Sequence, residues 1–182
     1  SKETWVPDDF VYILSHEYFN EPAVDAALKT TFEDFGVKTY SDDGFIKDVI
    51  VGDDDARSDI NYKLDEDLDA SKAFVRYLFN HRDSLKDKDN QLGQYVLCCN
   101  DINGEEYYLC DDDVRYFNQE AYDNNSCFAD NCEYDWLDDS MMYCLSPAYL
   151  QSFEETDRKA AESFLRQSFG VKTFTDKSFF KE

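Results

Sequence analysis

The hexapeptide "FGVKTF" at residues 169–174 repeats "FGVKTY" at residues 35–40, which lies 134 positions earlier (169 − 35). In both places, apolar residues at helical spacing lead up to the phenylalanine, and the glycine after it suits a left-handed helix end. The alternating residues that follow favour a short strand. The hexapeptide therefore predicts a helix end, a glycine stop and a strand start. This structural explanation is favoured over a binding role.

A second block repeats as well, because "WVPDDFVYILSHEYF" (5–19) aligns with "WLDDSMMYCLSPAYL" (136–150). Over both blocks, 6 of 15 and 8 of 14 positions are identical, where chance would give about two in total. The two regions are therefore predicted to be homologous units. The shared positions singled out are Trp5, Leu14, Ser15, Tyr18, Gly36 and Val37 in the first unit, and Trp136, Leu145, Ser146, Tyr149, Gly170 and Val171 in the second.

Each unit is expected to contain an amphipathic helix between two strands. In the first unit Asn20 can cap the helix, with Pro22 in its first turn. In the second unit "SFEE" (152–155) has the pattern of a capping box. The apolar stripes are Val24, Leu28, Phe32 and Phe35 in the first helix, and Ala161, Phe164, Leu165 and Phe169 in the second.

Three further elements are expected between the units. Apolar residues at helical spacing predict a helix over residues 70–85, and a short helix is expected near Val114–Glu120. Asn103-Gly104 between two β-prone runs predicts a type I′ hairpin. In that register Cys98 lies opposite Leu109.

These elements together predict an α+β fold with two homologous strand–helix–strand units flanking a helix and a β-hairpin. The expected division is a first unit over 1–52, a connecting segment over 53–135 and a second unit over 136–182. The second match stops at the chain end while the first runs on, which indicates a window from a longer tandem array.

The composition and charge of the chain limit the classes of partner that can be expected. The chain has 18 Lys and Arg against 41 Asp and Glu, a formal net charge of −23, and 16% aromatic residues. Such a surface repels nucleic-acid phosphates and anionic membranes, so neither is expected as a direct partner. No apolar run reaches the length of a membrane-spanning helix and no signal peptide is recognised. The cysteines are expected to be thiols in a reducing compartment.

The order of the motifs resembles the linking modules of sacsin-like and No-Vein-like proteins, which carry an N-terminal ATPase of the gyrase/chaperone (GHKL) type. The resemblance rests on Leu-Ser-x-x-Tyr (14–18 and 145–149), Gly-Val-Lys (36–38 and 170–172) and the Asn-Gly hairpin. It implies an internal, non-catalytic region of a large intracellular ATPase. The Mg-ATP motifs of that superfamily are missing, so no ATP-site residue is carried over.

Catalytic and metal-binding patterns are weak. No phosphate loop, dinucleotide fingerprint or nucleophile elbow is present. His16 faces proline in the other unit and His81 lies near a predicted helix end, so surface positions are favoured for both. The aspartate runs lack the EF-hand pattern and are interpreted as solvated surface. The irregular cysteine spacing disfavours a zinc site. The ligands of such a site would be Cys98, Cys110, Cys127 and Cys132.

We therefore expect a non-enzymatic scaffold or interaction region without a cofactor, located in the cytoplasm. Its partners would be other domains of the same large chain or other proteins. The alternative from another class is an acidic nucleic-acid mimic that blocks a basic DNA-binding protein, as the charge of −23 suggests. Carboxylates are numerous enough that a glycosidase-like pair is not excluded by residue type alone.

Overall fold

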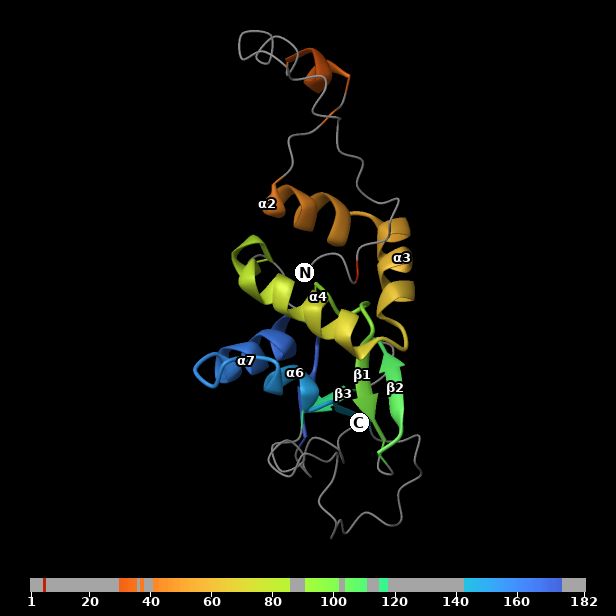
Figure 1. The fold of residues 1–182 in the computed structure, drawn as a ribbon, viewed down its shortest axis with the longest axis vertical. Helices are drawn as coiled ribbons and strands as arrows, with labels where there is room; N and C mark the ends of the chain where they lie inside the picture. The colour runs from red at the N-terminus through yellow and green to blue at the C-terminus, as the bar shows by residue number, and fades with distance from the viewer. Residues whose placement is uncertain are drawn as a thin grey trace.

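The computed structural model describes residues 5, 30–35, 37, 41–85, 91–101, 104–110, 115–117 and 143–174. It confirms the predicted α+β class, with some helices above the sheet and others beside it (Figure 1). The elements in chain order are α2 (Asp42–Phe45), the π-helical turn η3 (Ile46–Ile50), α3 (Asp54–Leu64), α4 (Leu68–Asn80), the 3₁₀ turn η4 (Arg82–Leu85), β1 (Leu97–Asn100), β2 (Glu106–Leu109), β3 (Arg115–Phe117), β4 (Tyr143–Leu145), α6 (Ala148–Gln151), α7 (Arg158–Ser168) and β5 (Lys172–Thr173).

Aspartate side chains start the two longest helices before the hairpin. Asp53 accepts a hydrogen bond from the backbone of Ala56 at 3.0 Å, and Asp67 does the same for Ala70 at 2.9 Å. The helix predicted over 70–85 is present as α4 and η4, with a break at His81.

All five strands form one mixed sheet in the order β2-β1-β4-β3-β5. β1 is antiparallel to both β2 and β4, whereas β3 is parallel to β4 and β5. The hairpin and the second repeat unit thus contribute to the same sheet.

The predicted hairpin is present, but its register is wrong by one residue. Cys98 lies opposite Tyr108 rather than Leu109, and Cys99 lies opposite Tyr107. Because side chains alternate between the two faces of a strand, this shift changes which residues of β2 share a face with Cys98.

The turn explains the shift. Asp101 donates from its backbone to the carbonyl of Glu105 at 3.0 Å, and its side chain accepts from the Glu105 amide at 2.9 Å. The connection therefore spans residues 102–104 instead of two residues. Gly104, with φ of +84°, supplies the left-handed residue that such three-residue loops use.

The short helix expected near Val114–Glu120 is also wrong, because Arg115–Phe117 is strand β3. All three residues of β3 are buried, and the strand lies between β4 and β5. Aromatic residues suit such a buried strand position, and pairing on both sides outweighs the weak local helical pattern.

In the second unit the apolar stripe is confirmed, since Ala161, Phe164 and Phe169 are buried. The capping box at Ser152 is wrong. Ser152 ends α6, with its hydroxyl donating to the Tyr149 carbonyl at 2.7 Å. The residues directly before it form the short helix α6, and α7 begins only at Arg158.

Most of the first unit lies outside the described residues. A helical segment at residues 30–34 is placed apart from the main group of helices and strands (Figure 1). Phe35, expected in an apolar core stripe, is instead 80% exposed. The expectation was therefore wrong for Phe35, although its repeat partner Phe169 is packed in the core.

Candidate functional site

The Leu-Ser-x-x-Tyr motif joins the sheet to α6. Leu145 lies opposite Cys99 on β1, and the Ser146 amide donates to the Cys98 carbonyl at 3.1 Å. The Ser146 side chain accepts from the Ala148 amide at 3.4 Å, at the start of α6. Leucine therefore anchors the strand and serine turns the chain into the helix.

Tyr149 completes this connection from inside the core. Its hydroxyl shares a 2.6 Å hydrogen bond with Ser71 on α4 and accepts from the Cys98 amide at 2.8 Å. Burial raises the pKa of Tyr149 far above its usual value, so the hydroxyl stays neutral. One side chain thus links α6, α4 and β1.

The Phe-Gly-Val-Lys motif is held by a buried arginine. Arg115 is 2% exposed. Its guanidinium donates to the carbonyls of Gly93, Tyr95 and Leu109 at 3.1 Å each, and to the carbonyl of Phe169. We call this arrangement the Arg115 cradle. It joins the end of α7 to the segment before β1 and to the end of β2.

Beyond the cradle, the chain turns into the sheet. Gly170 has φ of +70°, the left-handed conformation expected from the sequence. Val171 is buried, and β5 then pairs with β3. The Phe174 amide extends this pairing by donating to the Phe117 carbonyl at 2.9 Å. The predicted helix end, glycine stop and strand start are confirmed for the second hexapeptide.

The remaining shared positions are only partly described. Trp5 is fully buried and packs edge-on against Phe74, with ring centroids 4.9 Å apart. Val37 is half-buried. Leu14, Ser15, Tyr18, Gly36 and Trp136 lie outside the described residues.

The proposed zinc ligands are incompletely covered. Cys98 lies in β1 and Cys110 directly follows β2, while Cys127 and Cys132 are outside the described residues. Among the described residues, no three His, Cys, Asp or Glu side chains converge as a metal site would require. The four cysteines in the described part of the chain are thiols.

A tyrosine, an aspartate and a histidine meet where α2 approaches the end of α4. The Tyr77 hydroxyl donates to Asp42 at 2.7 Å, and His81 Nε2 lies 4.0 Å from the other oxygen of Asp42. Burial, then the bond to Asp42, raises the pKa of Tyr77 far above its usual value, so Tyr77 serves as a donor and not as a base. The cluster tethers α2 to α4. His81 lies at the C-terminal end of α4, as the sequence predicted.

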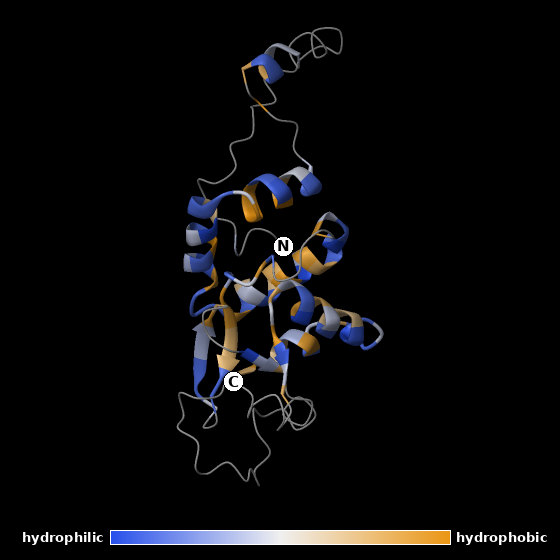
Figure 2. Cartoon of the chain, turned by 180° about the vertical axis from the view of Figure 1, so that it is seen from behind, coloured by the Kyte–Doolittle hydropathy of each residue, from blue (hydrophilic) through white to orange (hydrophobic). Residues whose placement is uncertain are grey.

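The outer side of α3 is acidic and carries an exposed aromatic ring. Asp55, Asp59 and Tyr62 follow one another at helical spacing, and Tyr62 is 81% exposed. We call these three residues the α3 outer stripe. Hydrophilic residues run along the length of this helix (Figure 2). The opposite side of α3 is buried, through Ala56, Ile60 and Leu64.

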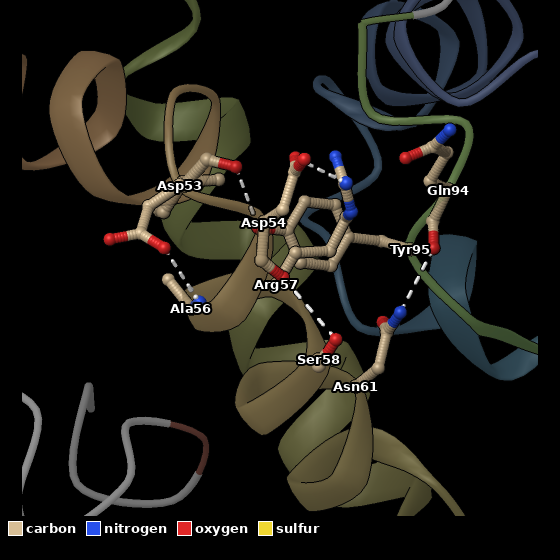
Figure 3. Close-up of polar contacts among 9 residues, drawn as sticks. Asp53, Asp54, Ala56, Arg57, Ser58, Asn61, Gln94 and Tyr95 are labelled. Atoms are coloured by element: carbon tan, nitrogen blue, oxygen red, sulfur yellow. Dashed lines mark hydrogen bonds and ion pairs between the residues drawn. The ribbon is translucent and has the colours of Figure 1, made fainter.

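Asn61 joins α3 to the segment before β1 (Figure 3). Asn61 donates to the Gln94 carbonyl at 2.9 Å and accepts from the Val96 amide at 3.1 Å. Arg57 pairs with Asp54 at 2.5 Å within the same helix. α3 was not predicted from the sequence, and neither was the α3 outer stripe. The pattern that indicates this helix is Asp53 as its cap, followed by apolar residues four positions apart.

No family model, curated protein or solved structure matches this chain. Within the residues that are described, no helix is both long and apolar enough to cross a membrane.

Proposed function

We propose that this chain is a non-catalytic scaffold and interaction region. One observation carries the proposal. Tyr149, Phe169 and Val171, three of the repeated residues, are buried where they join helices to the sheet. In the second unit these repeated residues serve packing, which is what a structural repeat needs, whereas an active site would gather titratable groups with shifted pKa values in a cleft.

The α3 outer stripe supports a role in binding proteins. Carboxylates around an exposed ring suit an arginine-rich segment, because arginine pairs with carboxylates and stacks on aromatic faces. With a net charge of −23, the chain also favours rapid encounter with basic partners. We propose a basic segment of another domain in the same chain, or of another protein, as the partner.

The resemblance to sacsin-like and No-Vein-like linking modules supports placing this region in a large cytoplasmic ATPase of the GHKL type. On that proposal the ATPase chemistry belongs to another part of the protein. Purified chain should then show no ATP turnover, and turnover that one carboxylate substitution abolishes would refute the non-catalytic assignment.

The test of binding uses a fluorescent arginine-rich peptide and two variants of equal charge. Asp55→Asn with Asp59→Asn removes two charges from the stripe, and Glu154→Gln with Glu155→Gln removes two exposed charges before α7. We expect the first pair to weaken anisotropy-measured binding about five- to tenfold at 150 mM salt and the second to change it less than twofold. Equal losses would refute a localised site.

The nucleic-acid mimic is the second candidate, favoured by the charge of −23. A mimic spreads its carboxylates along a phosphate-like path, so both variants should lose affinity in proportion to charge, with a steep dependence on salt. It should also compete with DNA for a linker histone. Equal losses in the peptide assay together with this competition would favour the mimic over the scaffold.

A further inference from the structure

β2 is an edge strand of the sheet. It stands at one end of the strand order, and within the described part of the chain no strand pairs with its outer side. β2 lies at the outer side of the sheet (Figure 1) and is more hydrophilic than β1 (Figure 2). An unpaired edge presents a row of backbone donors and acceptors, which is a template for a further strand.

The hydrogen bonds of β1 show which groups of β2 face outward. The Cys98 amide donates to the Tyr149 hydroxyl at 2.8 Å, and the Cys98 carbonyl accepts from the Ser146 amide at 3.1 Å. Since Cys98 directs both groups away from β2, its cross-strand neighbour Tyr108 directs its own amide and carbonyl away from β1. Glu106, two residues earlier, has the same direction. Among the described residues, no backbone group bonds to either of them on that side.

The side chains place one carboxylate and one aromatic ring on each face of this edge, because successive residues of a strand point to opposite faces. Glu105 and Tyr107 share one face, where the Tyr107 hydroxyl donates to Glu105 at 3.2 Å. Glu106 and Tyr108 share the other face. Both glutamates are exposed, whereas both tyrosines are half-buried.

The charge of the edge selects the kind of strand that fits it. Burial raises the pKa of Tyr108, and the negative charges of Glu106 and Asp67 raise it further. The whole chain has a net charge of −23. Like charges destabilise a strand pair and opposite charges stabilise it, so a second copy of this chain is disfavoured and a basic strand is favoured.

We propose that β2 is a docking edge for an extended basic segment of another protein, which adds to the sheet as a further strand. In an antiparallel arrangement, two β-branched residues would lie opposite Tyr108 and Tyr107, and two lysines opposite Glu106 and Glu105. The main chain would supply affinity and these side chains selectivity. The edge shares no residue with the α3 outer stripe, so this proposal and the proposed function stand or fall separately.

The test measures amide hydrogen exchange by NMR in the full chain, with a peptide in which two valines precede two lysines. In the free chain the Glu106 and Tyr108 amides should exchange rapidly, whereas the Tyr107 amide faces β1 and is protected. Saturating peptide should slow exchange at Glu106 and Tyr108 about tenfold or more and leave Tyr107 unchanged. Unchanged exchange at Glu106 and Tyr108, or slow exchange there already in the dilute free chain, would overturn the proposal.

Two N-methylated forms of the peptide are matched controls. A methyl group on the amide of the first lysine, opposite Glu106, removes a donor that faces β2. A methyl group on the amide of the second lysine, opposite Glu105, removes a donor that faces away. We expect the first to weaken binding about tenfold and the second less than about twofold. Equal weakening by the two methyl groups would overturn the proposed strand pairing.

Variants of the chain separate this edge from the α3 outer stripe. Glu105→Gln with Glu106→Gln should weaken binding of the valine–lysine peptide about fivefold, and Asp55→Asn with Asp59→Asn less than about twofold at 150 mM salt. Equal losses would overturn the assignment to β2. An arginine-rich peptide lacks the β-branched residues, so it is not expected at this edge. Protection of Glu106 and Tyr108 that rises with protein concentration without peptide would place a second copy at the edge and overturn the basic partner.

Discussion

Replacing Tyr149 by phenylalanine removes one oxygen atom from the centre of the fold. The ring is retained, so packing changes little. The lost hydroxyl, however, shares hydrogen bonds of 2.6 Å with Ser71 and 2.8 Å with the Cys98 amide. Both partners are fully buried, so bulk solvent does not reach them.

An unsatisfied buried polar group costs about 1–3 kcal/mol. Ser71 can rotate toward another acceptor, so the Cys98 amide carries most of the loss. We expect Tyr149→Phe to lower the free energy of unfolding by about 2 kcal/mol, which corresponds to a fall in Tm of roughly 4–8 °C for a chain of this size. Urea unfolding followed by circular dichroism measures the change.

Tyr62→Phe is the matched control, because its hydroxyl belongs to a residue that is 81% exposed. This substitution should alter stability by less than about 0.5 kcal/mol. A double-mutant cycle with Ser71→Ala should give a coupling energy of about 1 kcal/mol with Tyr149→Phe. Equal stability of Tyr149→Phe and Tyr62→Phe would refute the assigned role of the Tyr149 hydroxyl.

Four further substitutions test other contacts. Arg115→Met should cost about 3 kcal/mol or more in urea unfolding, because four backbone carbonyls lose a charged donor; a loss below 1 kcal/mol would contradict the cradle. Asn61→Ala should cost about 1–2 kcal/mol through its two bonds to the segment before β1, and an unchanged urea midpoint would count against them. Glu66→Gly should stabilise the fold by about 0.5 kcal/mol, because Glu66 has a left-handed φ of +59° and glycine relieves roughly 1–2 kcal/mol of backbone strain there. This relief outweighs the greater flexibility of glycine in the unfolded chain. A lowered Tm would argue against that strain. Lys72→Ala should raise the pKa of Asp69 toward 3.8 in a carboxyl NMR titration, because the hydrogen bond from Lys72 holds that pKa down. The stability that this pair contributes is present above pH 3.8 and is lost as the pH falls below 3.8. An unchanged pKa of Asp69 would contradict the pairing.

The second unit was largely predictable from local patterns. Ala161, Phe164 and Phe169 recur at helical spacing, and glycine after the last of them leaves few alternatives to a helix end. The paired β-prone runs with an Asn-Gly turn likewise predicted the hairpin. Local sequence is sufficient where every nearby preference agrees with the fold.

The failures have tertiary causes. The hairpin register depends on the Asp101 side chain bonding to the Glu105 amide, which the two-residue turn rule does not include. β3 depends on partners at positions 143–144 and 172–173, so its short sequence alone is a poor guide. The Arg115 cradle was missed because a buried arginine held by backbone carbonyls leaves no motif.

The candidate interaction surface was the least predictable part. The aspartates around α3 were interpreted as solvated surface without a helix to order them. Only the helix places Asp55, Asp59 and Tyr62 on one side. The net charge can be predicted from the composition, whereas the positions of the charges on the surface depend on the fold.

An NMR titration of the isotopically labelled chain with a bound peptide tests the proposed interaction role most directly. An arginine-rich peptide should shift the backbone amide resonances of α3, with the largest changes between Asp55 and Tyr62, and should leave α7 unchanged. The same titration with Asp55→Asn and Asp59→Asn should lose those shifts. Shifts spread evenly over the acidic surface, or centred away from α3, would contradict the account.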